Sequence, residues 1–321
     1  MKAAVYTEYG PPEVIKIQET DKPVPGDNEV LVRIFASSMN RTDCGFRKPE
    51  YPVIIRLING FFRPKISILG SEFSGEIEST GKEVKNFAAG DKVFGLSAGK
   101  FGTHAEYVCI PENGSIALKP DKMTYEEAAG VCDGLMLATA YIRKIDFSKK
   151  VKILINGASG SIGTAGVQLA RYYGASITAV CNEKNIELLK TLGAEKVIDY
   201  EKEDFTRDNE KYDVVFDAVG KSSFFKCRRL LKKEGMYFST EMGFMLQNIF
   251  LAFVTPVFGK RRVKFPLPKD SKADIEFFKE LIDSGHYRAV IDKVYPLNEI
   301  VEAAKYVETG CKTGNVVIKT G

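Results

Sequence analysis

The 321-residue chain has no tryptophan, only two histidines and no closely spaced pair of cysteines. His104 and His286 lie outside any Ser/His/Asp or metal-ligand pattern, so packing or surface exposure is the better interpretation of both. The absence of a CxxC pair excludes a disulfide framework and the common zinc-finger spacings. No signal peptide precedes the first strand pattern, and we expect a reduced, cytoplasmic protein. The six isolated cysteines are Cys44, Cys109, Cys132, Cys181, Cys227 and Cys311.

The chain also lacks a strong charge bias and a long apolar run. Its 46 Lys and Arg residues against 42 Asp and Glu residues leave a net charge of +4, which does not favour nucleic acid as a partner. The apolar segment 244–258 is interrupted by polar residues and Pro256, and is too short to span a membrane. A basic cluster at 260–264 follows it. Contact with a membrane surface is one interpretation; we favour a hydrophobic subunit interface followed by a solvated basic turn.

A strand, a glycine turn and a helix follow one another in the segment VKILINGASGSIGTAGVQLARYYGA, residues 151–175. Residues 151–156 are an apolar run typical of a buried parallel strand, and apolar residues then recur at helical spacing. The turn has the spacing GxxGxxG rather than the strict GxGxxG. A helix N-terminus after such a turn can hold the pyrophosphate of a dinucleotide. The candidate cofactor residues here are Ser159, Gly160, Ile162 and Gly163.

The strand–helix alternation continues after the turn. Strand patterns at 176–181, 196–199 and 213–217, with a helical pattern at 184–192, predict a doubly wound parallel sheet within residues 120–258. Its ligand is expected at the carboxyl ends of the strands, so Val219, directly after the strand at 213–217, is a further candidate cofactor residue.

A different domain surrounds this sheet. Residues 1–119 contain short strand patterns separated by Gly and Pro, which predicts a mainly β domain. The tail, residues 259–321, contains helical patterns near 272–284 and 297–309 and a strand pattern at 315–319, and is expected to rejoin that domain.

Several motifs together resemble the medium-chain dehydrogenase/reductase superfamily over essentially the whole chain. The resemblance implies an α/β protein in which a Rossmann doubly wound sheet, residues 120–258, is inserted into a GroES-like, mainly β catalytic domain. It also implies a homodimer. The matching segments are KAAVYTEYGPPEV near the start, ILGSEFSGEI (68–77), GDKVFG (90–95), HAEYV (104–108), VVFDAVG (214–220) and GNVVIK near the end.

The ligands of the catalytic zinc in alcohol dehydrogenases of this superfamily are not matched. Asn40 stands at the Cys of the CxxD motif, Ser71 at the His of the GHE motif, and Leu135 at the third ligand, although a small gap would bring Cys132 or Asp133 there. An amide, a hydroxyl and an alkyl group do not hold Zn²⁺ as thiolate and imidazole do, so no metal is expected.

The chain therefore resembles the zinc-independent quinone-oxidoreductase-like branch. That resemblance implies transfer of hydride from NADPH to a quinone or to the β-carbon of an α,β-unsaturated carbonyl compound. Two alternatives remain open: a non-catalytic NADPH-binding sensor or scaffold, and a metal-dependent alcohol dehydrogenase with unusual ligands.

The choice of NADPH depends on the end of the second strand of the sheet. In NAD-specific relatives an acid there binds the ribose hydroxyls, whereas Asn182 stands at this position. Lys184 offers a cation, and Tyr200 matches a position that lines the phosphate pocket of NADPH-dependent relatives. A shift of one residue would instead make Glu183 a ribose-binding acid, which would favour NAD.

The candidate catalytic residues are Asn40, Thr42 and Tyr51. Asn40 and Thr42 are expected to hydrogen-bond the nicotinamide ribose or a substrate carbonyl, although Asn40 is equally a common turn residue. Tyr51 has a phenol that can donate a proton or a hydrogen bond, and is otherwise a surface aromatic. Thr139, in LATAY, matches a family threonine near the nicotinamide and is the remaining cofactor candidate; a buried helical threonine bonded to the preceding turn would look the same. The physiological acceptor and the proton donor are not identified by any motif.

Overall fold

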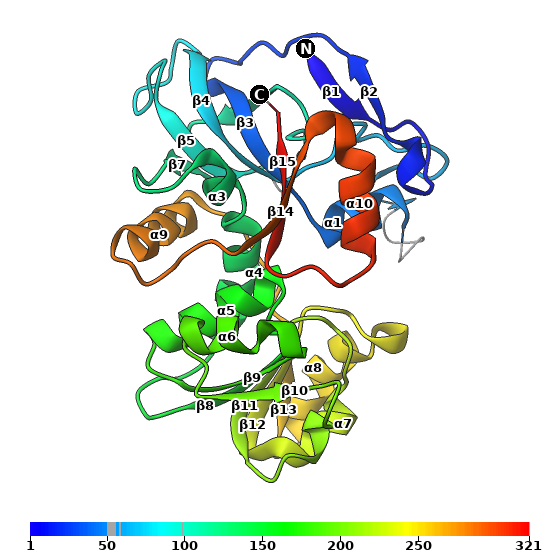
Figure 1. Ribbon diagram of the computed structural model, residues 1–321, viewed down its shortest axis with the longest axis vertical. Helices are drawn as coiled ribbons and strands as arrows, with labels where there is room; N and C mark the ends of the chain where they lie inside the picture. The colour runs from blue at the N-terminus through cyan, green and yellow to red at the C-terminus, as the bar shows by residue number, and fades with distance from the viewer. Residues whose placement is uncertain (50–55, 58, 98, 321) are drawn as a thin grey trace. The chain divides into compact units, whose positions relative to one another are not determined.

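The computed structural model describes residues 1–49, 56–57, 59–97 and 99–320. They form two compact units: residues Met1–Asp133 with Asp270–Gly321, and residues Gly134–Lys269 (Figure 1). The first unit is mainly β and the second contains a parallel sheet flanked by helices, so the fold class predicted from the sequence is confirmed. Residues Asp270–Gly321 of the tail belong to the first unit.

The described strands of the first unit form a seven-stranded sheet with the order β14-β15-β3-β4-β5-β7, in which β6 also pairs with β3, and a separate antiparallel pair β1-β2. The long central strand β3 has buried residues at most positions, because it pairs with β15, β4 and β6 and packs against the core. These strands are β1 (Lys2–Val5), β2 (Lys16–Glu19), β3 (Glu29–Met39), β4 (Glu72–Thr80), β5 (Lys92–Leu96), β6 (Tyr107–Pro111), β7 (Ile116–Leu118), β14 (Ile291–Pro296) and β15 (Asn315–Lys319).

The helices of the first unit pack against this sheet at positions that the apolar spacing predicts. The helical patterns near 272–284 and 297–309 correspond to α9 (Lys272–Asp283) and to η6 (Leu297–Glu299) with α10 (Ile300–Glu308). Buried residues of α10 form one core cluster with residues of β15 and of the loop before β4. The remaining elements are η1 (Pro12–Val14), α1 (Arg41–Arg47) and α3 (Tyr125–Ala129).

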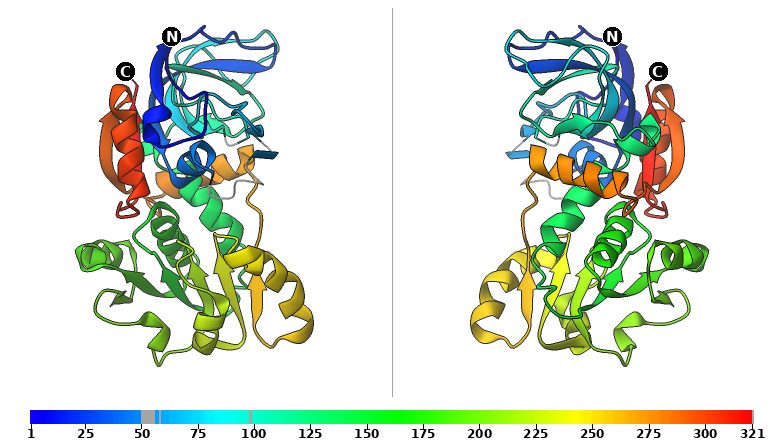
Figure 2. Two further views of the ribbon diagram at one scale, coloured as in Figure 1. Left: turned by 90° about the vertical axis from the view of Figure 1, so that its right-hand side faces the viewer. Right: turned by 90° about the vertical axis from the view of Figure 1, so that its left-hand side faces the viewer.

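The second unit contains a six-stranded parallel sheet, counted over its described strands, with the order β10-β9-β8-β11-β12-β13. Short runs rich in Val and Ile form its buried centre, as expected for strands covered on both faces. Figure 2 shows this sheet from two sides, with α8 beside the edge strand β13. The strands are β8 (Lys152–Asn156), β9 (Ser176–Cys181), β10 (Lys196–Asp199), β11 (Tyr212–Asp217), β12 (Leu231–Ser239) and β13 (Arg262–Lys264).

The helical segments of the second unit connect these strands. Helix α4 (Cys132–Ile142) contains the boundary between the two units, and the other helices follow strands of the sheet. They are α5 (Ser161–Tyr172), η2 (Glu183–Asn185), α6 (Ile186–Leu192), η3 (Phe205–Arg207), α7 (Phe224–Cys227), η4 (Arg228–Leu230), η5 (Phe244–Leu246) and α8 (Gln247–Phe258). Among the residues with described positions, no helix combines the length and the apolar character needed to cross a membrane.

Candidate active site

The glycine turn between β8 and α5 has the backbone that the sequence predicts. Gly157 has a φ of 74°, and Gly160 is the N-cap of α5 and provides no side chain to cap it. A Cβ atom on Gly163 would lie 2.2 Å from the carbonyl oxygen of Gly157, so only glycine permits this close approach of helix and turn. The first N–H groups of α5 have no partner within the helix, and they form a site suited to an anion.

Two buried hydroxyl groups of the second unit also have no hydrogen-bond partner among the described residues. They are Thr139 Oγ1 on α4, whose residue is 4% exposed, and Ser161 Oγ in the first turn of α5. A Cβ on Gly134 would lie 2.5 Å from Ser161 Oγ, which shows how closely the start of α4 approaches the start of α5. Buried hydroxyls without partners are costly unless a ligand completes them. The residues present therefore fit a nicotinamide dinucleotide.

Ser161 was not among the candidates from the sequence. Its position directly after the N-cap of the helix that follows a glycine turn is the local signal that could have identified it. Ser159 and Ile162 flank Gly160 and Ser161 in the same turn, as predicted from their spacing.

Val219 lies against the glycine turn. A Cβ on Gly157 would lie 2.6 Å from the Cβ of Val219, and the N–H of Ala218 donates to the carbonyl oxygen of Asn156 at 3.0 Å. The loop after β11 and the turn after β8 are therefore in contact, as the carboxyl ends of adjacent parallel strands should be.

The ends of β9 and β10 bring the other cofactor candidates together. The N–H of Tyr200 donates to the carbonyl oxygen of Cys181 at 3.0 Å, which places Tyr200 beside Asn182. Tyr200 is 53% exposed. The side chain of Asn182 accepts a hydrogen bond from Asn185 at 2.6 Å. Lys184 lies between these two asparagines in η2.

Glu183, the alternative ribose-binding acid, forms an ion pair. Lys202 Nζ lies 2.8 Å from Glu183 Oε1 and 3.6 Å from Asp199 Oδ2. Lys202 was not among the candidates, because a pair of residues 19 positions apart has no local sequence signal.

In the first unit, Asn40 and Ser71 are brought together. Asn40 is the N-cap of α1: its Oδ1 accepts from the N–H of Asp43 at 3.1 Å, and its own N–H donates to Asp43 Oδ2 at 2.9 Å. The remaining polar atom, Nδ2, donates to Ser71 Oγ at 3.2 Å. Asn40 is 7% exposed and Ser71 is 3% exposed. The amide thus both caps its own helix and bonds Ser71, the residue directly before β4.

Thr42 is exposed in the first turn of α1. Tyr51 lies outside the described residues.

Two buried carboxyl groups, of Asp43 and Glu72, and the half-buried carboxyl group of Asp133 lie near Asn40 and Ser71. Glu72 Oε1 accepts from the N–H of Asp133 at 2.8 Å, and Ser38 Oγ donates to its other oxygen. Burial, followed by the nearby Asp133 carboxylate, raises the pKa of Glu72 to about 8. Burial, with Asp43 nearby, raises the pKa of Asp133 to about 6, and burial also raises the pKa of Asp43. The described ion pairs include none to Glu72, and hydrogen bonds to both of its oxygens hold the carboxyl group instead.

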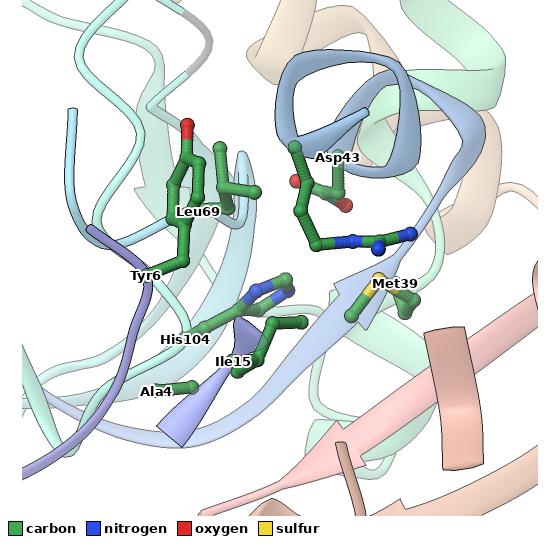
Figure 3. Close-up of a pocket in the computed structure, with 8 residues that line it drawn as sticks. Ala4, Tyr6, Ile15, Met39, Asp43, Leu69 and His104 are labelled. Carbon is green, nitrogen blue, oxygen red and sulfur yellow. The ribbon is translucent and has the colours of Figure 1, made fainter. Parts of the chain in front are cut away.

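The cavity in Figure 3, which Asp43 and Leu69 help to line, is too small for a substrate. Its volume is about 10 Å³, room for about one water molecule. His104 lines it with Nε2 2.9 Å from the carbonyl oxygen of Ser38, which is a structural role, as expected. Arg47 lines it too, with Nη1 donating to the carbonyl oxygen of Gly10 at 2.8 Å and an ion pair to Glu308.

The residues at the zinc-ligand positions do not fit a zinc ion. Asn40 and Ser71 offer an amide and a hydroxyl that already bond each other, and Leu135 offers no donor. Burial raises the pKa of the adjacent Cys132 thiol well above its usual range, which disfavours a thiolate ligand. In the described part of the chain no group of three or more His, Cys, Asp or Glu side chains is arranged to hold a metal.

Known proteins resemble this chain over its whole length. Residues 26–121 match the alcohol dehydrogenase GroES-like domain family, and residues 192–318 match a family described as zinc-binding dehydrogenase. A 2-methylene-furan-3-one reductase of Solanum lycopersicum is 33% identical, over 99% of this chain and 79% of that protein. An NADPH-dependent alkenal/one oxidoreductase of Arabidopsis thaliana is 30% identical over the same shares of the two chains.

Among solved structures, the quinone oxidoreductase from Coxiella burnetii superposes with a TM-score of 0.89 at 28% identity, covering 100% of this chain and 99% of that one. The whole-length matches agree with the glycine turn, the inserted parallel sheet and the returning tail. The chain therefore belongs to the medium-chain dehydrogenase/reductase superfamily, as an oxidoreductase of the quinone and enone reductase type.

Proposed function

We propose that this protein is a zinc-independent reductase that uses NADPH to reduce a quinone or an α,β-unsaturated carbonyl compound. The observation that carries the proposal is the Asn40–Ser71 pair, an amide bonded to a hydroxyl at 3.2 Å where metal-dependent relatives have zinc ligands. The names of the relatives in tomato and Arabidopsis, a furanone reductase and an alkenal/one oxidoreductase, support acceptors with a conjugated carbonyl.

The bound cofactor supplies the hydride, and the chain supplies binding and orientation. Gly160, Gly163 and the first N–H groups of α5 hold the pyrophosphate, with Ser159 and Ile162 in the same turn. Thr139 and Val219 are proposed to contact the nicotinamide half.

The substrate oxygen needs only hydrogen-bond donors. In a conjugated acceptor the negative charge that develops after hydride transfer spreads onto oxygen, and donors such as an amide N–H stabilise it without a Lewis acid. Asn40 is proposed as such a donor, or as a donor to the nicotinamide ribose. Thr42 and Tyr51 are also proposed as catalytic residues. Thr42 is exposed.

NADPH is proposed over NADH because the strand ends of β9 and β10 present little free negative charge. Asn182 is neutral, Lys184 adds a cation, and Tyr200 offers an exposed phenol. The ion pair between Lys202 and Glu183 also supports NADPH, because the Lys202 cation offsets the negative charge of Glu183, which would otherwise repel a 2′-phosphate.

We also propose a cytoplasmic homodimer whose contact includes the outer face of α8. Phe250, Phe253 and Val257 recur at helical spacing on this face and are 66%, 77% and 72% exposed. Three large, exposed apolar side chains that neighbour one another are unusual on a monomer.

The division into a catalytic domain, residues 1–119 and 259–321, and a nucleotide domain, residues 120–258, is likewise a proposal. No nucleic-acid partner is proposed.

The test is oxidation of NADPH by purified, metal-analysed protein with a panel of quinones, enals and enones, and with NADH in parallel. We expect turnover that does not depend on zinc and is insensitive to a chelator. Alcohol oxidation that is lost on chelation would contradict the proposal and favour a metal-dependent dehydrogenase. Tight NADPH binding without turnover of any acceptor would also contradict it, and would favour a non-catalytic sensor.

A further inference from the structure

Asp217, the last residue of β11, is a fully buried carboxylate without a cation. It is 0% exposed, and no ion pair to it is found among the described residues. Three neutral donors bond it instead. Asn156 Nδ2 donates to Oδ1 at 2.9 Å, while the N–H of Ser222 at 2.8 Å and the hydroxyl of Tyr237 at 3.1 Å donate to Oδ2.

These donors come from three separate segments at the carboxyl end of the sheet. Asn156 ends β8 and directly precedes Gly157 of the glycine turn, Ser222 lies in the loop after β11, and Tyr237 lies on β12. Burial and the Asp217 carboxylate itself raise the pKa of Tyr237 well above its usual range, so the phenol keeps its proton and donates. The carboxylate thus ties the loop 218–222 to the glycine turn and to the next strand.

The loop that Asp217 holds lies on one side of the cofactor site. In the sheet, β9 and β10 lie on one side of β8, and β11 and β12 lie on the other. The ribose and adenine of a dinucleotide bind at the end of the second strand, here β9. The pyrophosphate sits at the turn after β8, so the nicotinamide half must extend toward the ends of β11 and β12.

We propose that Asp217 is a positioning residue for the nicotinamide half of the cofactor: its three hydrogen bonds fix Val219 and the backbone of 218–222 against the glycine turn. The proposal rests on the proposed function in that it requires a bound nicotinamide dinucleotide. It extends that function, because Asp217 itself is too buried to touch the ligand and acts through the loop.

Asp217→Asn is the informative variant. The amide keeps the shape of the carboxylate but loses its charge, and it places its NH₂ group opposite hydrogen-bond donors. The matched control is Asp213→Asn, at the opposite end of the same strand, where the carboxylate bonds Lys232 at 2.7 Å and the N–H of Lys152 at 2.9 Å.

The experiment measures equilibrium binding of two probes to the full chain: NADPH, and adenosine 2′,5′-bisphosphate, which has the adenosine half but no nicotinamide. For Asp217→Asn we expect NADPH to bind about tenfold more weakly, and the bisphosphate to bind within about twofold of the wild type. Asp213→Asn should leave both affinities unchanged. A uniform loss for both probes would indicate a general structural defect and overturn the proposal, as would unchanged NADPH binding.

Tyr237→Phe provides a second variant if Asp217→Asn does not fold, because it removes only the hydroxyl donor. We expect the same selective loss for NADPH, about threefold, and equal binding to the wild type would overturn the proposal. A wild-type chain that binds the bisphosphate but no complete dinucleotide would also overturn it. A wild type that binds none of the three ligands, NADPH, NADH and the bisphosphate, would instead overturn the proposed function, so the two failures are distinguishable.

Discussion

The side-chain amide of Asn40 caps helix α1 through Oδ1 and donates to Ser71 Oγ through Nδ2 at 3.2 Å. The first contact is local, and the second joins residues 31 positions apart. Since the two contacts use different atoms, substitutions can remove them separately. The stability of α1 and the chemistry of the site can therefore be tested independently.

Asn40→Ser and Asn40→Ala should differ in stability but agree in activity. Serine is a good N-cap, whereas alanine loses the bond to Asp43 at a cost of about 1 kcal/mol in the free energy of unfolding. Neither side chain keeps the amide donor, so we expect both variants to lower kcat/KM for an enone by about tenfold to a hundredfold. Urea unfolding and steady-state kinetics give the two quantities. Wild-type kcat/KM in Asn40→Ser would contradict a catalytic role for Asn40.

Lys184→Ala should change the choice of cofactor. If Lys184 bonds the 2′-phosphate, its loss removes a charged hydrogen bond, and the KM for NADPH should rise about tenfold while the KM for NADH stays constant. The matched control is Lys190→Ala, because Lys190 forms an exposed pair with Glu187 in the next helix. An equal effect on NADPH and NADH would contradict the assignment.

Lys202→Ala tests the compensation of Glu183 at the same strand ends. Without the ion pair of 2.8 Å, the Glu183 carboxylate becomes available to ribose hydroxyls and repels a 2′-phosphate. We expect the ratio of kcat/KM for NADPH to that for NADH to fall about threefold to tenfold. The double variant Lys202→Ala with Glu183→Gln should restore the wild-type ratio. Failure of the second substitution to restore it would mean that Glu183 is not the group involved.

The sequence predicts the nucleotide-binding sheet well because its signals are local. The apolar run before Gly157, the glycine spacing and the helical periodicity after it all lie within one short segment. The glycines report backbone geometry directly: Gly157 has a left-handed φ, and Gly163 permits the close approach of helix and turn. The strand, turn and helix therefore appear where the pattern predicts them.

The sequence predicts side-chain partners less well. Lys202 and Glu183 are brought together by the parallel pairing of β9 and β10, which no periodicity specifies at the level of single side chains. The two hydrogen bonds of the Asn40 side chain show the same limit. The sequence pattern of the turn indicates that Asn40 caps α1, but it does not indicate the bond to Ser71, directly before β4. Ser161 was missed because a serine in a glycine turn has many ordinary roles; its position after the N-cap is only a weak signal, and the structure adds that its hydroxyl has no partner among the described residues.

The stability of the folded chain should depend on pH through Glu72. Its pKa of about 8 lies above the ordinary value of 4.5, so the folded state holds this proton more tightly than the unfolded state does. The resulting stabilisation is fully present below about pH 4.5 and is lost as the pH rises through about 8. While the two states differ by one proton, the free energy of unfolding falls by at most about 1.4 kcal/mol per pH unit.

Glu72→Gln should remove this dependence, because glutamine resembles the protonated acid and cannot ionise. Urea unfolding between about pH 5 and pH 8 should give a flatter profile, with the variant more stable than the wild type at the upper end. Glu83→Gln, at an exposed position, is the control and should follow the wild-type profile. Parallel profiles for Glu72→Gln and the wild type would show that Glu72 is ionised at neutral pH in the folded state.

The outer face of α8 should hold the proposed dimer together. Phe253 is 77% exposed in the isolated chain, and burial of such a side chain in an interface contributes about 2 kcal/mol. Phe253→Glu places a charge in that contact, and we expect a monomer by sedimentation or light scattering at concentrations where the wild type is dimeric. Phe225→Glu is the matched control: Phe225 lies on α7 and is 64% exposed, so the same change in chemistry occurs away from the proposed contact. A wild type that is monomeric at high concentration, or a Phe253→Glu variant that stays dimeric, would contradict the assignment of this face.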